Sequence, residues 1–479
     1  MIISHFFKKN TVFILFVILS GIFISLVWNN NVWMDEAFTA SLVHTDFAGV
    51  IERSMADTLP PLYNIFLWTM TAVFGYSTPV MKITSLIPMI ATLFIGATVV
   101  RKRWGNKVAA LFMMLVTLMP LMLSFGVEIR MYSMGFFFAT ASGVYAYEFA
   151  CDTTKKNMAL FVIFSTLAGY THHFAFVTAA FSYLYLLIYF FISDRKRIRQ
   201  WISCLVATFI LYIPCLIVTL GQISRVSGYF SMPDVTAAVF GKYMIYPFIV
   251  GVTPATVICM LIMAGAVAAF AAGIRNGSTD IHMAAYLVFC LLTYYGVLVF
   301  GTIVSRIMTA NIFVDRYLFF ATGLLWLFAA IVLGRLDTKG YVVSCVCAVF
   351  VGICTYIVAF KAEYGNTADE EIAFLRDNVS EGDIYFSIGG HEEMQNCIPF
   401  YTYLDSETPE LTFVYPLEEA IKKSQEKGTG LWISVLDGFE PTREDMEIFE
   451  KYGITLEKKA DFSFDRYRCE MYKAKAGDL

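Results

Sequence analysis

Charged residues are scarce in this sequence. Asp, Glu, Lys and Arg together make up 15% of the 479 residues, whereas hydrophobic residues make up 58%. Soluble domains contain about 25% charged residues, so the deficit indicates that lipid is the solvent for most of the chain. A basic excess is also missing, because 35 Lys and Arg face 39 Asp and Glu. The resulting net charge of −4 argues against nucleic acid as a partner.

Two further signatures are missing from the sequence. The ten cysteines do not form a disulfide framework, because most of them lie in or beside apolar segments, where cysteine serves as a small hydrophobic residue. Only Cys397 and Cys469 fall in the polar C-terminal region, and they could pair only in an oxidising compartment. That region also contains no Gly-rich phosphate loop, so we do not interpret it as nucleotide-binding.

Apolar stretches instead alternate with short basic clusters as far as about Phe360. A helix needs roughly 20 apolar residues to cross the hydrocarbon of a membrane. No small-residue cleavage pattern follows the first stretch, so we interpret it as a retained span and not as a signal peptide. Eleven spans are predicted, over residues 11–28, 80–100, 107–125, 132–150, 158–171, 174–193, 200–221, 248–273, 283–304, 316–334 and 341–360.

The basic clusters predict the orientation of these spans, because Lys and Arg concentrate on the cytoplasmic side. With eleven spans and a cytoplasmic N-terminus, every cluster falls inside. The clusters are Lys8-Lys9, Arg101-Lys102-Arg103 with Lys107, Lys155-Lys156, Arg195-Lys196-Arg197 with Arg199, Arg275, and Arg335 with Lys339. Leu62 to Phe74 must then not cross. It is only about 13 residues long and follows Pro60-Pro61, so we predict a juxtamembrane helix within a first outer loop over residues 29–79.

Charged residues become frequent from Lys361 onward, which sets the predicted domain boundary. Residues 1–360 are expected to form a transmembrane catalytic domain, and residues 361–479 a soluble extracytoplasmic domain. Helices are predicted over 369–378, 392–403, 417–427 and 443–452, the last with Thr442 as its N-cap, and strands over 383–387, 411–415, 431–436 and in two further segments that end at Ala474. Such alternation indicates a small α/β layer structure. The predicted fold class is therefore a polytopic α-helical membrane protein with a small α/β domain at its C-terminus.

The same topology gathers the informative polar residues on the outer face. Ionisable residues at membrane depth are costly and are functional candidates by default. They occur in four places: Asp35-Glu36 after the first span, Glu128, Arg130 and Tyr132 at the end of the third, His172-His173 at the tip of a hairpin, and Arg316-Tyr317 at the start of the tenth.

Asp35 and Glu36 are flanked by Trp33, Met34 and Ala37. An apolar surround destabilises a charged carboxylate, which makes it a competent general base. The alternative is a solvated start of a loop. Adjacent side chains in a helix point about 100° apart, so the two carboxylates are expected to have different roles.

Glu128 and Arg130 have two interpretations. They could form an ion pair that closes the third span, or Arg130 could bind a phosphate while Glu128 orients it, because guanidinium matches phosphate oxygens in fork geometry. Arg316 is a second cationic candidate, or else an interfacial anchor. His172 and His173 are adjacent, which is poor spacing for one metal ion. One of them could assist Asp35 or Glu36, with or without a divalent cation held by Glu36, His172 or His173, or make a single polar contact.

These residues, in this order, resemble the GT-C superfamily of membrane glycosyltransferases, and most of all family 39, the protein O-mannosyltransferase and aminoarabinose-transferase group. The resemblance covers most of residues 10–335. It is carried by Asp35-Glu36, Leu59-Pro60-Pro61-Leu62-Tyr63, the basic turn Arg101–Lys107, Glu128-Ile129-Arg130-Met131-Tyr132-Ser133, Tyr170-Thr171-His172-His173-Phe174 and Arg316-Tyr317. Many members have His or Lys before the two prolines, where this chain has Leu59, and the hairpin motif also differs. Both differences weaken the assignment of the family's residue roles to those positions of this chain.

The resemblance implies an inverting transfer of a sugar from a polyprenyl-phosphate donor at the outer face. Asp35 would deprotonate the acceptor hydroxyl, while Arg130 and Arg316 would stabilise the departing lipid phosphate. Glu36, Glu128 or a histidine would orient the acceptor or hold a metal. The acceptor is a lipid, a surface polymer or a protein.

Two other classes of protein fit a chain with many spans. A transporter or lipid flippase places charged sites near the midplane of the membrane and has internal repeats, but no convincing repeat is present. A membrane anchor that only presents the C-terminal domain would not need eleven spans.

Overall fold

The computed structural model describes residues 2–229, 235–307, 311–389, 395–404, 407–463 and 468–476, with the backbone alone for 2–9 and 223–229. The side chains of Lys8 and Lys9 therefore lie outside the described residues. The chain divides into two compact units. The first comprises Met1–Ser25, Phe47–Phe66 and Ile83–Ala359, and the second comprises Leu26–Asp46, Leu67–Lys82 and Phe360–Leu479.

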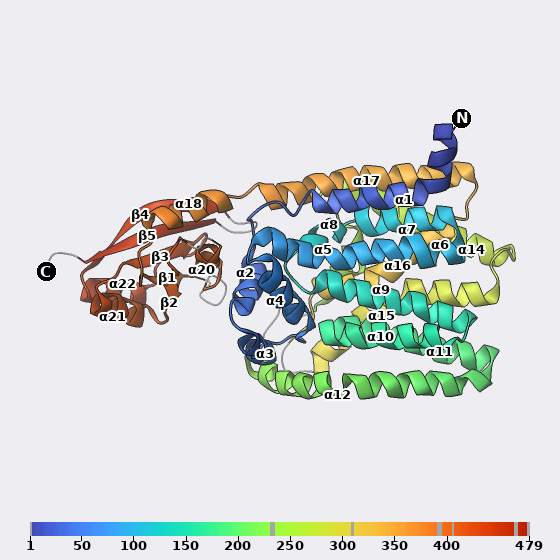
Figure 1. Cartoon of the computed structure of the whole chain (residues 1–479), viewed down its shortest axis with the longest axis horizontal. Coiled ribbons are helices and arrows are strands. Elements are labelled where there is room, and N and C mark those ends of the chain that lie inside the picture. The colour runs from blue at the N-terminus through green and yellow to red at the C-terminus, as the bar shows by residue number, and fades with distance from the viewer. Residues whose placement is uncertain are drawn as a thin grey trace. The chain divides into compact units, whose positions relative to one another are not determined.

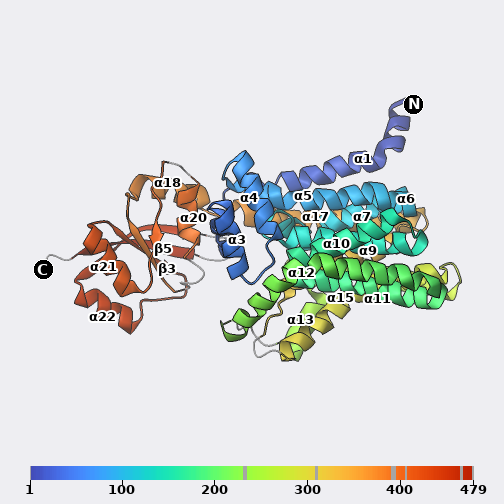
Figure 2. The ribbon, with the colours of Figure 1, turned by 60° about the horizontal axis from the view of Figure 1, so that its bottom comes forward.

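The first unit is a helix bundle, in which α9, α10, α11 and α12 run side by side (Figures 1 and 2). Its long helices are α1 (Ile2–Ile24), α5 (Thr78–Ile95), α7 (Asn106–Leu118), α9 (Tyr132–Cys151), α10 (Lys155–Thr171), α11 (His173–Ser193), α12 (Ile198–Tyr229), α14 (Thr253–Arg275), α15 (Ile281–Ile307), α16 (Phe319–Leu333) and α17 (Thr338–Tyr364). Its shorter elements are α3 (Phe47–Ala56), η1 (Gly96–Val100), α6 (Arg101–Trp104), α8 (Met122–Val127), η2 (Arg195–Arg197), α13 (Ala237–Ile245), η3 (Tyr246–Phe248) and η4 (Asp315–Leu318). Helix α4 (Leu62–Phe74) begins in the first unit and continues in the second from Leu67 onward.

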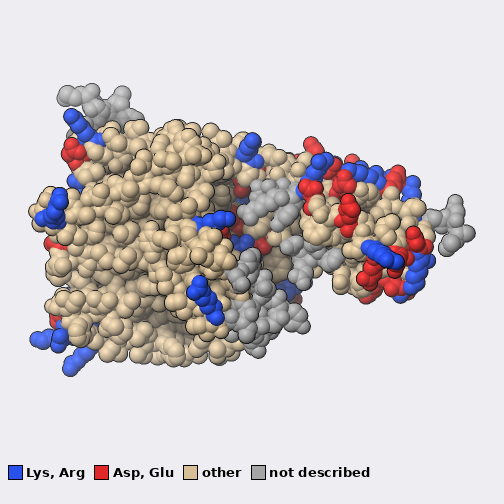
Figure 3. Space-filling view, turned by 180° about the vertical axis from the view of Figure 1, so that it is seen from behind, with Lys and Arg blue, Asp and Glu red and all other residues tan. Residues whose placement is uncertain are grey.

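Helices long and apolar enough to cross a membrane number seven in the described part of the chain. They span residues 78–104, 173–193, 195–222, 253–275, 281–307, 315–333 and 338–378, and each coincides with a predicted span. The other four predicted spans fall on α1, α7, α9 and α10, and the total of eleven stays a prediction. Figure 3 shows the matching surface: uncharged residues cover most of the bundle, and Lys and Arg gather along one edge of it, at the left of the view. The chain is thus a multi-pass α-helical membrane protein, as predicted.

Helix α16 is the central helix of the bundle. Every residue from Phe319 to Leu333 is buried, which explains why this segment is apolar on all sides. It packs closely on α9, where a Cβ atom placed on Gly323 would meet Oγ1 of Thr140 at 1.9 Å. Small residues at such crossings let two membrane helices approach each other.

The prediction of one continuous helix over residues 107–125 was wrong. Helix α7 ends at Leu118, and α8 begins only at Met122. Pro120 has no N–H to donate and disfavours helical backbone at Met119, which is extended with φ −75° and ψ 161°. Leu121 then adopts a positive φ of 73°. The break moves the chain to a new path just before Glu128 and Arg130.

The second unit contains α2 (Met34–Val43) and a five-stranded mixed sheet of order β2-β1-β3-β5-β4. The strands are β1 (Ile384–Ile388), β2 (Thr412–Phe413), β3 (Leu431–Leu436), β4 (Ile454–Ser463) and β5 (Arg468–Ala476). The helices are α18 (Ala368–Asn378), α20 (Cys397–Tyr403), α21 (Leu417–Lys427) and α22 (Arg443–Lys451). Strand β1 pairs in parallel with β2 and β3, and β5 pairs antiparallel with β3 and β4.

These elements confirm the predicted α/β domain. Thr442 caps α22, because its hydroxyl accepts the N–H of Asp445 over 3.1 Å. The predicted helix over 392–403 is α20, and residues 392–394 lie outside the described part. Cys397 and Cys469, the two candidates for a disulfide, are both buried free thiols.

Candidate functional site

Asp35 and Glu36, the predicted catalytic carboxylates, occupy the first turn of α2 in the second unit. The hydroxyl of Thr39 donates to the backbone carbonyl of Asp35 over 2.8 Å, one turn further along the helix. Asp35 is half-buried, whereas Glu36 is buried. The two adjacent carboxylates therefore differ in their access to solvent.

Glu36 helps to form the start of α2. Its Oε2 accepts the backbone N–H of Trp33 over 2.9 Å. The first N–H groups of a helix have no partner within the helix, so a carboxylate that reaches back to one of them stabilises the helix start. This contact fixes the entry of the chain into α2, in the same turn as Asp35.

The other predicted residues belong to the first unit. Glu128 and Arg130 lie in the short connection between α8 and α9, and Tyr132 is the first residue of α9. The N–H of Arg130 donates to the carbonyl of Glu128 over 2.6 Å, which closes a tight turn. The side chains of this turn are buried: Glu128 is 8% exposed, Arg130 is 9% exposed, and Tyr132 is not exposed. Buried charges need compensating groups nearby.

Five of the predicted residues form one cluster in this unit. The hydroxyl of Tyr132 lies in the electrostatic field of Arg316, Arg130 and Glu128. His172 lies in the field of the same two arginines. Arg316 comes from η4, directly before the central helix α16. Three segments far apart in the sequence thus bring two guanidinium groups beside one imidazole and one phenol.

His172 connects α10 to α11 and caps the second of these helices. Its Nδ1 accepts the backbone N–H of Phe174 over 3.0 Å. A ring nitrogen that accepts a hydrogen bond carries no proton, so the imidazole is neutral with its proton on Nε2. The ring also packs against Tyr317, with ring centroids 4.6 Å apart. These contacts fix the direction in which the Nε2–H group points.

Nε2 of His172 and the hydroxyl of Tyr132 are both buried and have no hydrogen-bond partner among the residues that the structure describes. Buried polar groups are nearly always hydrogen-bonded, so two such donors require an explanation. Beside Arg130 and Arg316, they form a set of groups suited to an anion with several oxygen atoms, such as a phosphate. We shall call these four residues the anion cluster.

An apolar cavity of about 340 Å³ adjoins the anion cluster. His172 and Tyr317 form part of its wall, and most of the remaining wall is hydrocarbon, including Leu59, Val177 and Val304. Gln222 fixes one edge, because its Nε2 donates to the carbonyl of Leu59 over 2.9 Å. The cavity is thus suited to a hydrocarbon chain whose charged end lies at the cluster.

His173 lies on the wall of the same cavity and is hydrogen-bonded to the backbone of Thr58. The predicted metal set of Glu36, His172 and His173 is divided between the two units. Among the described residues, three or more His, Cys, Asp or Glu side chains do not gather as a metal site. Metal binding therefore stays a prediction.

A polar network that the sequence patterns did not predict surrounds Lys82, which is in the second unit with Asp35. Lys82 is fully buried and pairs with Glu363. A signal was present in the sequence: Lys82 is a lone charge near the start of the apolar stretch 80–100. Its partner is 281 residues away in the chain, and no local pattern points to it.

Comparison with known proteins agrees with the fold predicted from the motifs. No family model and no curated protein matches the sequence. The chain shares its fold with two solved structures of ArnT.

The particular structures that resemble the chain include the crystal structure of ArnT from Cupriavidus metallidurans in the apo state, with a TM-score of 0.67 and 10% identity over 97% of this chain and 98% of that chain. The same ArnT bound to undecaprenyl phosphate gives a TM-score of 0.64 and 11% identity over the same shares. A looser similarity, with a TM-score of 0.48 and 11% identity, relates 94% of this chain to 72% of the Archaeoglobus fulgidus oligosaccharyltransferase in complex with Zn and sulfate.

Proposed function

We propose that this chain is an inverting glycosyltransferase that moves a sugar from a polyprenyl-phosphate donor to an acceptor hydroxyl, amine or phosphate at the outer face of the membrane. The observation that carries the proposal is the anion cluster beside the apolar cavity. A polyprenyl phosphate has one phosphate head and one hydrocarbon tail, and the two parts match the cluster and the cavity. The similarity to the fold of ArnT, of which one structure contains undecaprenyl phosphate, supports this class of donor.

The reaction assigns one role to each part of the site. Asp35 takes the proton from the acceptor hydroxyl, and the acceptor oxygen forms a bond to the anomeric carbon of the sugar. The bond between that carbon and the phosphate oxygen breaks on the opposite side, which inverts the carbon. Negative charge grows on the departing lipid phosphate, where Arg130, Arg316, His172 Nε2–H and the Tyr132 hydroxyl stabilise it.

The role of Asp35 as the general base can be tested most directly. Asp35→Asn keeps the size of the side chain but cannot take a proton, so transfer is expected to fall by about 100-fold or more. The measurement is mass spectrometry of envelope glycolipids, surface polymers and proteins from a deletion strain complemented with each variant. Asp46→Asn is the matched control, because Asp46 is an exposed carboxylate in the same segment.

Normal products from the Asp35→Asn strain would overturn the assignment of Asp35 as the base. The competing function, transport of a lipid or sugar, predicts a different result. Vesicles that contain the purified protein would then move substrate across the bilayer without forming a glycosidic bond.

A further inference from the structure

The segment that carries Asp35 belongs to the same compact unit as the C-terminal domain, although more than 300 residues separate them. Residues Leu26–Asp46 and Phe360–Leu479 fall together in the second unit. The contacts between these two parts therefore determine how α2 and its carboxylates are held.

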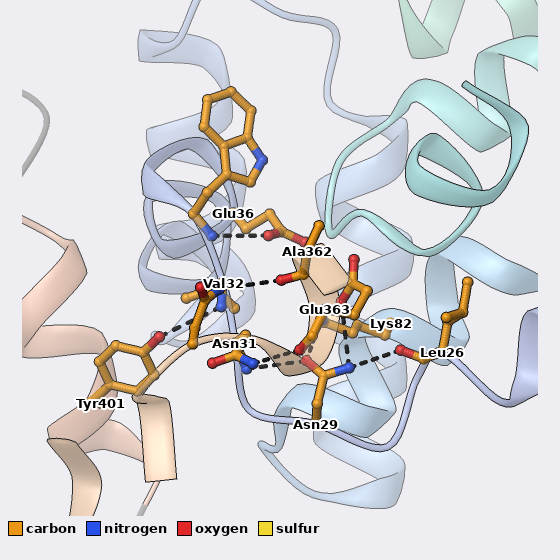
Figure 4. Close-up of polar contacts among 11 residues, drawn as sticks. Leu26, Asn29, Asn31, Val32, Glu36, Lys82, Ala362, Glu363 and Tyr401 are labelled. Atoms are coloured by element: carbon orange, nitrogen blue, oxygen red, sulfur yellow. Dashed lines mark hydrogen bonds and ion pairs between the residues drawn. The ribbon is translucent and has the colours of Figure 1, made fainter. Parts of the chain in front are cut away.

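Glu363, in the last turn of α17, is the centre of these contacts (Figure 4). Its carboxylate pairs with the ammonium of Lys82, and its backbone carbonyl accepts a hydrogen bond from Nδ2 of Asn31. The side chain of Lys82 is 1% exposed and that of Glu363 is 15% exposed. Removing one partner of such a buried pair leaves the other charge without compensation, so the pair is expected to be sensitive to substitution.

Asn29 joins this ion pair to the backbone of the loop. Its Oδ1 accepts from Nζ of Lys82 over 2.7 Å and from the backbone N–H of Asn31 over 3.1 Å. Its Nδ2 donates to the carbonyl of Leu26 over 2.7 Å and to the Glu363 carboxylate over 3.3 Å. One amide therefore connects Leu26, the ion pair and the chain that leads to α2.

The C-terminal domain makes a second set of contacts with the same segment. Helix α20 packs against α2, and the hydroxyl of Tyr401 accepts the backbone N–H of Val32 over 3.4 Å. Tyr403 stacks on His44 at the other end of α2, with ring centroids 4.4 Å apart and planes 5° apart. Nδ2 of Asn30 also donates to Asp369 over 2.8 Å. Both ends of α2 are thus held by residues of the C-terminal domain.

We propose that the C-terminal domain positions the carboxylate of Asp35. The domain does so through Glu363 and Tyr401, which hold the segment before α2. This inference rests on the proposed function for the role of Asp35. A general base must lie within hydrogen-bond reach of the proton that it takes, and a displacement of about 1 Å can cost 100-fold in rate. The domain holds the loop and the helix start at fixed points, and it does not itself touch the reacting atoms.

The first experiment measures the loop without any substrate. Amide hydrogen exchange of residues 29–46 is followed in the full-length protein in detergent. In Glu363→Gln, Lys82 loses its charge partner, and exchange in this segment is expected to rise by about tenfold or more. Glu457→Gln is the matched control, because it removes exposed ion pairs with Lys459 and Lys475 in the same unit.

A milder variant keeps the proposal falsifiable if Glu363→Gln does not fold. Tyr401→Phe removes one hydroxyl and leaves the ring in place. Tyr385→Phe is its control, because Tyr385 is an equally buried tyrosine whose hydroxyl pairs with Ser434 over 2.8 Å, away from the loop. Exchange at Val32 is expected to rise in Tyr401→Phe and to stay at the wild-type level in Tyr385→Phe.

The second experiment separates positioning from donor binding. Glu363→Gln and Tyr401→Phe are expected to lower product formation severalfold, while the affinity of the purified protein for polyprenyl phosphate stays at the wild-type level. Wild-type exchange in both variants would overturn the proposal, as would unchanged product formation despite raised exchange. Failure of the proposed function looks different, because Asp35→Asn would then give normal products whatever the exchange data show.

Discussion

Tyr132 and His172 lie within the electrostatic field of the same two guanidinium groups, those of Arg130 and Arg316. Tyr132 begins α9, and His172 precedes α11, so two neighbouring helices each present a buried donor at one point. This arrangement has an energetic cost in the absence of a ligand, because both donors are removed from water. A phosphate at the cluster would remove that cost.

The two buried donors can be removed one at a time. Tyr132→Phe and His172→Asn should each weaken binding of polyprenyl phosphate by about tenfold, the effect of one lost hydrogen bond to a charged group. Asn at residue 172 keeps an oxygen that can cap α11, so the fold should stay intact. Tyr185→Phe is the control, because it removes another buried hydroxyl without a partner among the described residues. Equal affinities in all three variants would contradict the phosphate site.

The arginines should contribute more than the neutral donors. Arg130→Ala and Arg316→Ala are each expected to reduce the affinity for polyprenyl phosphate by about 10- to 100-fold. Arg130→Lys should recover only part of the loss, because an ammonium cannot make the two parallel hydrogen bonds of a guanidinium. Binding is measured with purified protein in detergent. Lys102→Ala, at an exposed position of the basic turn, should bind like the wild type.

The apolar cavity should determine how the hydrocarbon chain of the polyprenyl phosphate binds. Val177→Trp places a large ring into the wall of the 340 Å³ cavity and should exclude a long polyprenyl chain. Affinity for the long-chain phosphate should fall, while affinity for a phosphate with a short chain changes little. Val346→Trp, on the exposed surface of α17, is the control for the added ring. An equal loss for both chain lengths would point to damage at the anion cluster instead.

Glu371 gives a pH-dependent prediction for the C-terminal domain. Burial raises the pKa of its carboxyl well above the usual 4.5. The folded state then holds this proton more tightly than the unfolded state, so stability falls as pH rises from about 4.5 toward the raised pKa. The Glu371→Gln variant has no proton to release at this position, so its stability does not fall with pH in this way. It should unfold at a higher temperature than the wild type near neutral pH, but not at about pH 4. Glu370→Gln, at the exposed neighbouring residue, should show no such difference.

The membrane topology has its own test. With α4 lying on the membrane, a cysteine at Ser77 should react with an impermeant thiol reagent from outside, and a cysteine at Asn106 only after the membrane is opened. The unmodified chain supplies the background from its natural cysteines. If α4 crossed the membrane, the two labelling patterns would be reversed.

Local patterns predicted most elements of the fold correctly. Strand β3 and helix α21 have the boundaries expected from the sequence, because a short apolar run, a helical period of apolar residues and the flanking turn residues are all encoded within a few positions. The break between α7 and α8 was missed, since the hydropathy of residues 107–125 is uniform although Pro120 interrupts the helix.

The residues of the anion cluster could be predicted from the sequence, but the network around Lys82 could not. Arg130, His172 and Arg316 could be recognised because each is an ionisable residue in an apolar stretch. Burying such a residue is costly whatever its partners are. The network of Glu363, Asn29 and Lys82 could not be predicted, because it depends on contacts across 281 to 334 residues of sequence. Glu363 itself lies among many charged residues and does not stand out.

The contacts of Asn31 and Val32 with Glu363 and Tyr401 also set an order of events during synthesis. The two partners lie 332 and 369 residues after the loop that they hold. At roughly 5 to 20 residues per second, about 20 to 70 seconds pass before the ribosome has made them. Through that interval the helices of the bundle enter the membrane while α2 still lacks its supports. The segment that carries Asp35 is therefore among the first parts of the chain to be made and among the last to reach its final form.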